Sequence, residues 1–310
     1  MRIITHDDIV KLSIDPMTCY QWMKEALAIK DEVFLEAKTS MKPKPGVFFT
    51  SMPCLIPQEH VYGLKMVSRI PGRLPALNST INLYDSESGA FLAVMDCDWI
   101  TAMRTGAVAA FSIMKLAKQN FQTIACIGLG NTCLAVLTVL LPLLKNRKLT
   151  IKLKQYKDQA EKLIQRFQKY DQIDFVVVND DEALFRGNDV ILSCVTTMDH
   201  NMAKDEWFDE GVLVVPVHTM GFQNCDQFFD KFVYDDYDHV KNFKYFHAFC
   251  DKLELKDLLT HSYRTNEQER IIAYNVGIAL FDLYFAIKIF HLILQFKEVP
   301  FLVNTQKEWL

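Results

Sequence analysis

The chain has 310 residues, and its 34 Lys+Arg and 38 Asp+Glu give a formal net charge of −4. A chain of this length is expected to form about two domains, and the 50% hydrophobic content is enough for a sizeable core in each. Nucleic-acid binding requires a basic surface, and disorder requires a low apolar content. The composition therefore argues against both.

The eight cysteines form no CxxC pair and have no metal-ligand spacing, so we expect no metal site. Several of them lie in apolar runs, which is typical of free thiols in a reducing compartment. The N-terminal segment lacks the apolar core of a signal peptide. The longest uncharged apolar run, 133–144, is too short to span a bilayer and contains Pro142. We expect a cytoplasmic protein without a membrane segment.

Residues 1–118 predict a helix followed by an antiparallel sheet. An amphipathic stretch after Asp15-Pro16 keeps helical spacing of its apolar residues to about residue 37. The segment 42–46, KPKPG, is expected to end this helix. Runs of strand length, bounded by turn residues, then follow. They lie at 47–56, 61–70, 79–85 and 90–96, and the sequence DSESG at 85–89 predicts a hairpin turn between the last two.

From residue 100 the pattern changes. The stretch 100–117 is rich in small residues at helical spacing, which predicts a helix packed closely on a neighbour. Compact apolar strands then alternate with helical segments, which is typical of a parallel, doubly wound α/β sheet. The predicted strands lie at 123–130, 149–156, 175–180, 189–195 and 211–217. We expect one long apolar helical stretch over 266–297, too apolar for a free surface helix, to pack back on the first domain.

The glycine-rich sequence Gly128-Leu129-Gly130-Asn131-Thr132-Cys133 lies between a predicted strand and a predicted helix. Gly128 permits the tight turn, and Gly130 lets backbone N–H groups approach a pyrophosphate at the helix N-terminus. The third position of the motif is Cys133, a small residue that this packing tolerates. In its strand–turn–helix context the motif predicts a site for NAD or NADP, with Asn131 and Thr132 among its contacts. The alternative is a glycine-rich turn without a ligand.

The acidic residue that usually binds the ribose 2′-hydroxyl is missing from the end of the next predicted strand. Residues 152–157 read KLKQYK, with no Asp or Glu before Asp158. Lys154 and its neighbours could bind a 2′-phosphate, which would favour NADPH, or they could be solvated surface lysines. The choice between NADH and NADPH stays open at this point.

Several blocks carry a resemblance to a known family. They are GLKMVSRIPGRLPALNSTINLYD with its continuation to ITAMRTGAVAAFSIMKLA, then IACIGLGNT, GNDVILSCVTT and YNVGIALFDLYFA. In these blocks and their order, over about residues 42–289, the chain resembles the ornithine cyclodeaminase/mu-crystallin family. The resemblance implies a homodimer in which residues 1–118 and 266–310 form a substrate-binding and dimerisation domain. It also implies that residues 119–265 form a Rossmann domain for NAD(H) or NADP(H).

The resemblance implies hydride transfer between nicotinamide and the α-carbon of a small amino or imino acid. Lys65 falls on the family's active-site lysine, where it could donate or accept a proton at the reacting C–N bond. Arg104 falls on the arginine that binds the substrate carboxylate, for which a planar two-nitrogen donor is suited. A surface Lys65 and a structural Arg104 are the alternatives. A further upstream basic residue could be Lys42 or Lys44. Cofactor contacts or simple capping positions are expected at Thr105, Ser193, Thr196 and Thr197.

The loop after the strand at 211–217 departs from the cyclodeaminases, which have Gly-Gly-Asp there. That Asp acts in deamination and ring closure, whereas this loop has Met220 or Gly221 in its place, and Asp226 matches a later acidic residue that tends to be structural. His218 in the same loop could act as an acid or base near neutral pH. We therefore expect an NAD(P)-dependent amino- or imino-acid oxidoreductase. The alternatives are an ornithine cyclodeaminase, which forms proline and ammonia with NAD recycled, and a non-catalytic NADP-binding protein like mu-crystallin.

Overall fold

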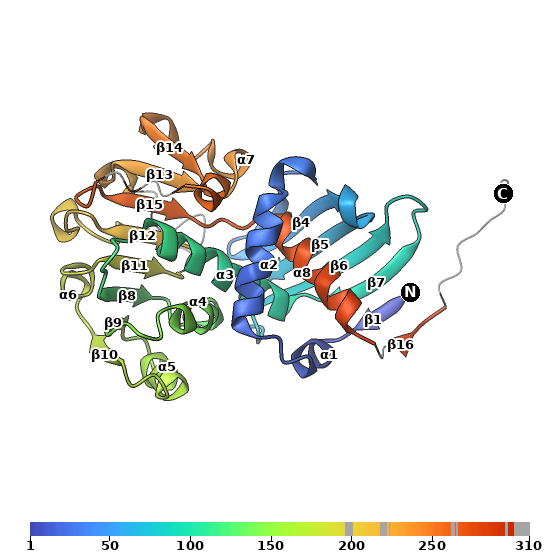
Figure 1. Ribbon diagram of the computed structural model, residues 1–310, viewed down its shortest axis with the longest axis horizontal. Coiled ribbons are helices and arrows are strands. Elements are labelled where there is room, and N and C mark those ends of the chain that lie inside the picture. Colours follow the sequence, from blue (N-terminus) through green and yellow to red (C-terminus); the bar gives the residue numbers. More distant parts are fainter. Residues whose placement is uncertain are drawn as a thin grey trace.

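A computed structural model describes residues 1–195, 201–217, 222, 224–261, 264, 266–294 and 297–300. In these residues the strands form two eight-stranded sheets, each in its own lobe (Figure 1). Helix α2 (Pro16–Ala28) stands where the lobes meet and packs on helix α3 (Asp98–Leu116) and helix α8 (Ala279–Leu292). The expected combination of a Rossmann-type sheet with an α+β part is confirmed.

The first sheet is mixed and contains both chain ends. Its order is β16-β1-β7-β6-β5-β4-β2, with β3 paired on β4; β1 runs parallel to β7 and the other pairs are antiparallel. The strand predictions between residues 47 and 96 are confirmed. The strands are β1 (Arg2–Ile4), β2 (Phe34–Leu35), β3 (Thr39–Lys44), β4 (Val47–Ile56), β5 (Val61–Arg69), β6 (Leu77–Asp85), β7 (Phe91–Asp96) and β16 (Lys297–Glu298).

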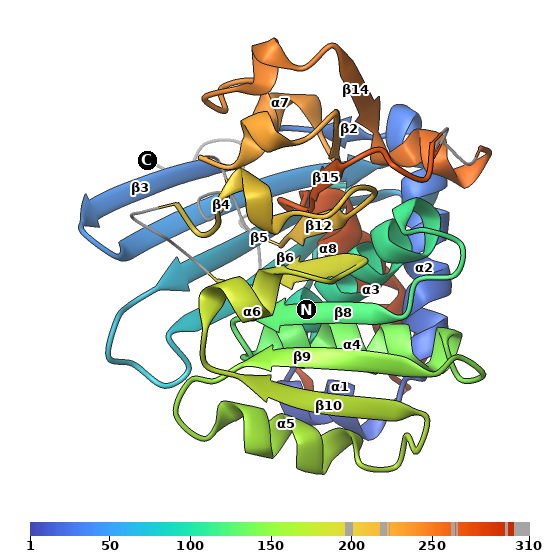
Figure 2. The same cartoon turned by 90° about the vertical axis from the view of Figure 1, so that its left-hand side faces the viewer.

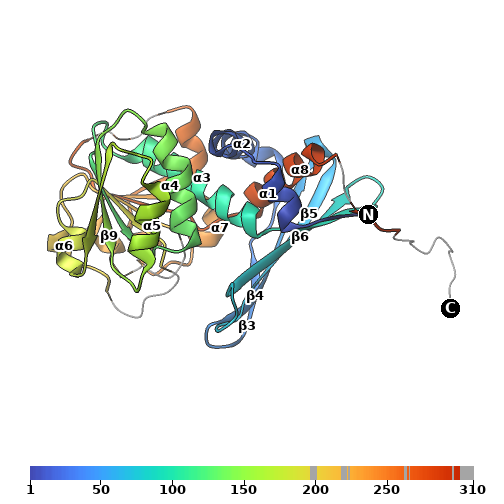
Figure 3. The same ribbon diagram turned by 90° about the horizontal axis from the view of Figure 1, so that it is seen from below.

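The N-terminal helix is shorter than predicted. Asp15 caps α2 by accepting a hydrogen bond of 2.7 Å from the backbone N–H of Met17, with Pro16 at the first helical position. The helix ends at Ala28, and residues 39–44, where a break was expected, form the exposed strand β3. Helix α8 packs on β4 and β5, and helix α3 packs on β6, so that helices lie on one face of the first sheet (Figure 3). Helices α1 (His6–Lys11) and α2 pack on α3.

The second sheet is parallel throughout, as predicted, and has the order β10-β9-β8-β11-β12-β15-β13-β14. Its first five strands follow the Rossmann order 3-2-1-4-5, and β15, the last strand of this sheet along the chain, takes the sixth place. Figure 2 shows β10, β9 and β8 side by side. The strands are β8 (Thr123–Ile127), β9 (Leu149–Lys154), β10 (Ile173–Val178), β11 (Val190–Ser193), β12 (Leu213–Pro216), β13 (Lys231–Tyr234), β14 (Asp251–Glu254) and β15 (Ile271–Tyr274).

The α-helices of this lobe are α4 (Asn131–Leu143), α5 (Gln159–Phe167), α6 (Asp181–Phe185) and α7 (Tyr237–Val240). Six short 3-10 helices occur along the described chain. They are η1 (Lys30–Glu32), η2 (Pro57–Glu59), η3 (Asp205–Trp207), η4 (Asp226–Phe228), η5 (Phe246–Ala248) and η6 (Leu255–Leu259). None of the helices in the described ranges is long and apolar enough to cross a membrane.

The prediction of one helical stretch over 266–297 is wrong in its first part. The β-branched pair Ile271-Ile272 lies in β15, which pairs with β12 and β13, and α8 begins only at Ala279. Gly277 separates the two elements with a positive φ of +84°, a conformation that favours glycine. We propose to place the return of the chain to the first domain after β15, later than residue 266.

Helix α3 contacts both lobes, since it packs on β6 of the first sheet and on α4 and β12 of the second lobe. A Cβ on Gly106 would lie 2.5 Å from the carbonyl oxygen of Ala135, so the backbones of α3 and α4 are in close contact. The close packing predicted from the small residues of this helix is confirmed. The same helix carries Arg104, and its neighbour α4 begins at the glycine-rich loop.

Candidate functional site

A buried ion cluster joins three elements of the first domain. Lys65 on β5 and Arg104 on α3 both contact the same carboxylate oxygen, Oδ1 of Asp282 on α8; Lys65 Nζ lies 2.7 Å away and Arg104 Nε lies 3.0 Å away. The exposed fractions are 1% for Lys65, 7% for Arg104 and 0% for Asp282. Burial of charged groups is unfavourable unless they are paired, so this geometry is strongly specified by the fold.

Lys65 is held from two sides. Its ammonium group donates to Asp282 and also to Thr101 Oγ1 at 2.7 Å, while the Thr101 hydroxyl donates to the carbonyl oxygen of Cys97 at 2.7 Å. An ammonium group has three N–H donors. Two are therefore used within the described part of the chain, where the third has no partner.

Arg104 presents the end of its guanidinium group over the backbone of Gly277. A Cβ at this glycine would overlap Arg104 Nη1 and would lie 3.0 Å from Nη2. Nε is occupied by Asp282, whereas Nη1 and Nη2 have no hydrogen-bond partner among the described residues. These two nitrogens are the pair that can bind a carboxylate with two parallel hydrogen bonds.

Lys38 is the third cation of the site, and sequence reasoning missed it. Its Nζ donates to the carbonyl oxygen of Val276 at 3.2 Å. Burial, together with the positive charges of Arg104 and Lys65, lowers the pKa of Lys38 to about 8, against the opposing effect of Asp235. Lys38 thus shares the electrostatic environment of the ion cluster.

Lys42 and Lys44, the expected upstream basic residues, do not lie at the ion cluster. Lys42 and Lys44 are exposed on β3, and the structure gives neither a contact with the ion cluster. An exposed ammonium on an edge strand is solvated and has no fixed position from which to orient a substrate. We therefore replace Lys42 by Lys38 as the candidate for substrate binding.

Three buried carboxylates have an oxygen without a partner among the described residues. They are Asp226 (Oδ2) in the second lobe, and Asp282 (Oδ2) and Asp235 (Oδ1), whose other oxygens contact the ion cluster or Gly277. The other oxygen of Asp235 accepts from the backbone N–H of Gly277 at 2.6 Å, and burial raises the pKa of Asp235. With Lys38 protonated, three cations face two carboxyl groups, which leaves a net positive charge. A ligand with one carboxylate would neutralise this charge, and its N–H groups could satisfy the free carboxyl oxygens.

The pKa of Lys38 leads to a pH prediction. The KM for a carboxylate substrate should rise as pH increases through about 8, by at most about tenfold per pH unit, because only the protonated ammonium of Lys38 attracts the carboxylate. In the unfolded chain the pKa of Lys38 is about 10.5. Below pH 8 the burial of charged Lys38 lowers the free energy of unfolding, and this loss of stability should disappear as pH rises from about 8 to 10.5. Steady-state kinetics across this pH range measure the effect.

Matched variants test the assignment of this pH dependence. Lys38→Arg keeps its charge throughout the range and should remove the rise in KM. Lys42→Ala, which changes an exposed lysine of β3, should leave the rise in place. A rise that persists unchanged in Lys38→Arg would contradict the role given to Lys38.

The glycine-rich loop leaves β8 at the carboxyl edge of the second sheet. Gly128 has a φ of +82°, and a Cβ there would lie 2.7–2.8 Å from backbone atoms of Cys194 and Val195. Gly130 differs, because a Cβ on it would have no atom of the described residues within 4 Å. The open space at the N-terminus of α4 fits the pyrophosphate of a dinucleotide, with the first-turn residues Asn131 and Thr132 beside it.

Cys133, at the third position of the glycine motif, packs against neighbouring side chains. The Cys133 side chain is fully buried, and its thiol is within hydrogen-bonding contact of Cys126 and Cys194. The close approach of α4 to β8 and β11 thus accepts a cysteine where the motif usually has Gly or Ala. The cysteine at this position does not occupy the open space next to Gly130.

The other candidate residues lie on three different elements or outside the described ranges. Thr105 is half-buried on α3, next to Arg104. Lys154 ends β9, where its Nζ donates to the carbonyl oxygen of Asn179 at 2.7 Å and to Asp181 Oδ1 at 2.5 Å. Ser193 ends β11 and is buried. Outside the described residues lie His218, Thr196 and Thr197.

The glycine loop and the backbone segments that contact Lys38 and Arg104 lie at the same edge of the second sheet. Asp235 directly follows β13, and Val276 and Gly277, which contact Lys38 and Arg104, follow β15. These segments and the loop after β8 all leave carboxyl ends of parallel strands. Ligands of open α/β sheets bind at this edge.

Comparison with known proteins decides the family. The sequence profile of the ornithine cyclodeaminase/mu-crystallin family matches residues 6–227. The chain belongs to the ornithine cyclodeaminase/mu-crystallin family.

Relatives of this family member include the nodulation efficiency protein NfeD of Rhizobium meliloti, 25% identical over 267 residues that cover 82% of each chain. The fold is similar to that of Thermococcus litoralis Δ1-pyrroline-2-carboxylate reductase in complex with NADH and L-proline, with a TM-score of 0.83, 20% identity and coverage of 94% and 97% of the two chains. It is also similar to an archaeal alanine dehydrogenase dimer with bound NAD, with a TM-score of 0.81, 21% identity and coverage of 94% and 95%.

In this member of the ornithine cyclodeaminase/mu-crystallin family, part of the ion cluster lies beyond the matched region. The profile covers Lys38, Lys65, Arg104 and the glycine loop. Asp235 and Asp282, two of the residues with an unpartnered oxygen, follow its last matched residue. The structure therefore adds two carboxyl groups to the residues that the sequence had singled out.

Asp226, expected to be structural, is buried on η4 and accepts a hydrogen bond of 2.6 Å from the hydroxyl of Tyr274. Tyr274 stacks on Phe232 with 5.2 Å between ring centroids, inside an aromatic cluster of the second lobe. Burial raises the pKa of Asp226 to about 7. These contacts agree with a role of Asp226 in the packing of this lobe.

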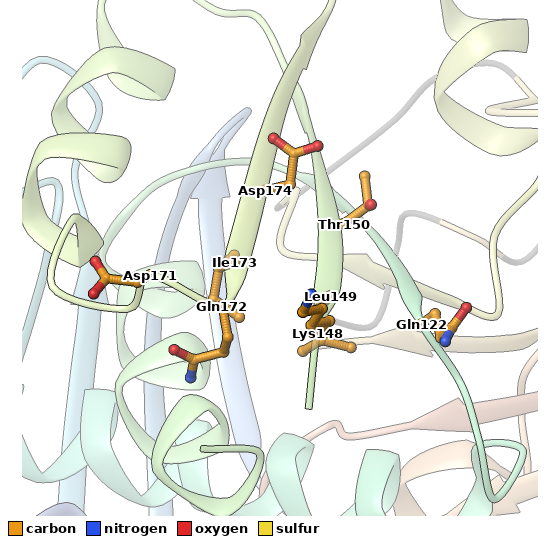
Figure 4. A pocket seen from close by; sticks show the side chains of 8 residues that line it. All are labelled: Gln122, Lys148, Leu149, Thr150, Asp171, Gln172, Ile173 and Asp174. Atoms are coloured by element: carbon orange, nitrogen blue, oxygen red, sulfur yellow. The ribbon is translucent and has the colours of Figure 1, made fainter. Parts of the chain in front are cut away.

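A surface hollow of this family member lies at the other edge of the second sheet (Figure 4). Gln122 precedes β8, and the first residues of β9 and β10 line the hollow with the loop at 171–172. This is the amino-terminal edge of the strands, opposite the glycine loop, and we do not assign it to the candidate site. Among the described residues, no group of His, Cys, Asp and Glu side chains could hold a metal ion.

Proposed function

We propose that the protein is an NAD(P)-dependent oxidoreductase that transfers a hydride between nicotinamide and the α-carbon of a small amino or imino acid. The observation that carries this proposal is the free end of the Arg104 guanidinium beside the unpartnered Oδ2 of Asp282, at the sheet edge that also carries the glycine loop. The guanidinium nitrogens can bind a carboxylate, and Asp282 Oδ2 can accept a hydrogen bond from an N–H group. An α-amino or α-imino acid carries both of these groups on one carbon atom. The family membership and the nucleotide-bound structural neighbours support it.

The roles of the residues follow from their contacts. Arg104 Nη1 and Nη2 bind the α-carboxylate, and the ammonium of Lys38 adds attraction for the same group. Lys65 directs its remaining N–H to the substrate nitrogen, where it holds or delivers a proton. Asp282 positions both Lys65 and Arg104 and accepts an N–H of the substrate. A bound nicotinamide cofactor supplies or accepts the hydride.

The nucleotide cradle is proposed to include Gly128, Gly130, Asn131 and Thr132. The buried positions of Lys65, Arg104 and Asp282 keep water away from their charges, which strengthens their interaction with a charged substrate. Their attachment to one strand and two helices fixes the orientation before the substrate binds. Such preorganisation is how a site of this kind accelerates a reaction.

A panel of substrates tests the function. The purified protein is incubated with 2-oxo acids plus ammonia or amines, and with cyclic imino acids, in the presence of NADH or NADPH, and the loss of reduced-nicotinamide absorbance is followed. We expect turnover of at least one small member. Tight nucleotide binding with no turnover of any member would contradict the proposal and would favour a binding protein. Release of ammonia and proline from ornithine without net absorbance change would instead identify a cyclodeaminase.

We also propose that the protein forms a homodimer through the first sheet. Gly63 packs against Leu283 of α8, so its neighbours Tyr62 and Leu64 on β5 point to the face that no helix covers (Figure 3). Tyr62 contacts Tyr84, which stacks on Phe91 with 4.8 Å between ring centroids, so this face carries an apolar row. An uncovered apolar sheet face is typical of an interface, and the archaeal alanine dehydrogenase is a dimer.

Light scattering on the eluting peak of a size-exclusion column tests this assembly. The expected mass is twice that of one chain. Leu64→Lys, which introduces a charge on the uncovered face, should shift the protein towards the mass of one chain. A wild-type protein with the mass of a single chain would contradict the dimer.

A further inference from the structure

We infer that the nucleotide site selects NADP(H) over NAD(H), with Lys154 as the residue that binds the 2′-phosphate of the adenosine ribose. This inference rests on the proposed function, because it concerns the same nucleotide site. It goes further in naming the cofactor and the residue that discriminates between two nucleotides that differ only by one phosphate.

The register of the sheet places Lys154 where the ribose is bound. Cys126 of β8 lies opposite Leu153 of β9, so the next pair brings Ile127 beside Lys154, directly before the glycine loop. In the Rossmann arrangement the pyrophosphate lies on the loop after the first strand, and the adenosine ribose lies at the carboxyl end of the second strand. Those strands are β8 and β9 in this chain.

The end of β9 and the residues directly after it lack the carboxylate that selects NAD. A carboxylate here would accept hydrogen bonds from the ribose hydroxyls and would repel a phosphate. Instead the strand ends in Lys154, followed by the neutral Gln155 and by Tyr156 and Lys157. The first carboxylate, Asp158, is turned to Lys162 with 2.7 Å between the charged atoms.

Gln155 supplies the neutral acceptor that the ribose needs. Its Nε2 donates to the carbonyl oxygen of Lys157 and to Glu161 Oε1, which fixes the orientation of the amide. Its Oε1 is buried and has no partner among the described residues. A buried acceptor without a donor is unfavourable, and a ribose hydroxyl would satisfy it without the repulsion that a carboxylate would exert on a phosphate.

Lys154 is preorganised at this end of the sheet. Its ammonium group is anchored by the carbonyl oxygen of Asn179 and by Asp181, both from the segment after β10, and its side chain is 22% exposed. The Asp181 side chain is 54% exposed, so it can turn into solvent when a phosphate with higher charge takes its place on Lys154. The ion pair thus holds the lysine in position until the nucleotide binds.

Isothermal titration of the purified full chain with NADP⁺ and with NAD⁺ tests the inference by binding alone. We expect NADP⁺ to bind at least about tenfold more tightly than NAD⁺. In Lys154→Met the affinity for NADP⁺ should fall by about 10- to 100-fold, while the affinity for NAD⁺ stays within about threefold. Asp181→Asn, which releases the lysine, should keep or strengthen NADP⁺ binding.

Lys152→Met is the matched control, because Lys152 lies two residues earlier on the same strand and donates to the carbonyl oxygens of Ala183 and Arg186. It should leave the preference between the nucleotides unchanged. Equal or tighter binding of NAD⁺ by the wild type, or an equal loss of both nucleotides in Lys154→Met, would overturn the inference and leave the proposed function standing. Binding of neither nucleotide would instead remove the proposed function.

Discussion

Replacing Arg104 by alanine is expected to raise the KM for the amino- or imino-acid substrate by about 30- to 1000-fold, equivalent to about 2–4 kcal/mol. The variant loses the two nitrogens that bind the carboxylate. Asp282 keeps its contact of 2.7 Å with Lys65, so the carboxylate left behind is still paired. The thermal stability should therefore change less than substrate binding. Steady-state kinetics and a thermal unfolding curve separate the two effects.

Two glycine variants serve as controls for this prediction. Gly277→Ala keeps the charge of Arg104 but places a Cβ that overlaps Nη1, so the guanidinium must move and KM should rise. Gly72→Ala introduces a side chain at the same φ of +84°, where nothing lies within 4 Å, and should leave KM unchanged. An unchanged KM in Arg104→Ala, or an equal rise in both glycine variants, would show that Arg104 does not bind the carboxylate.

The parts of the fold that follow from local patterns could be predicted from the sequence. The bounds of β4 match the predicted run 47–56, and the continuous apolar runs after residue 123 form parallel strands as expected. The glycine motif is informative for the same reason. The conformation of Gly128 and the open space at Gly130 depend on neighbours within a few residues or in the adjacent strand.

The rest of the candidate site depends on contacts between distant parts of the chain. Lys38 looks like any other lysine in the sequence, and only folding brings it under the influence of Arg104 and Asp282. Asp282 does carry a signal in the sequence, since it is the one carboxylate of α8, whose other residues are apolar apart from Lys288 and His291. A buried charge of this kind needs a partner. Here the partners are 178 and 217 residues away along the chain.

The division between β15 and α8 was missed because apolar residues fill both elements. A short apolar run fits a buried strand and a buried helix equally well. The deciding features are the β-branched pair at the start of β15 and the positive φ of Gly277, and only the second is a property of the folded chain. This turn is also the one that brings the backbone of Gly277 under Arg104, so the error in the fold and the incomplete site have the same origin.

Replacing Gly130 by valine is expected to abolish nucleotide binding while the protein stays folded. Gly130 has a φ of −85°, which any residue can adopt, and a Cβ there meets no atom within 4 Å in the part of the chain that the structure describes. The branched side chain would instead occupy the space proposed for the pyrophosphate and would keep it from the N-terminus of α4. The unfolding temperature without nucleotide should therefore stay close to that of the wild type.

Gly128→Ala provides the contrast, because its Cβ would lie 2.7 Å from the backbone of Cys194 at a φ of +82°. This variant should lose stability even without nucleotide. In the wild type, a nucleotide at 100 times its Kd stabilises the folded state by about 2.7 kcal/mol, which raises the unfolding temperature. The rise should disappear in Gly130→Val. If Gly130→Val kept this rise, the pyrophosphate could not lie over Gly130, and the nucleotide would have to bind at another part of the sheet edge.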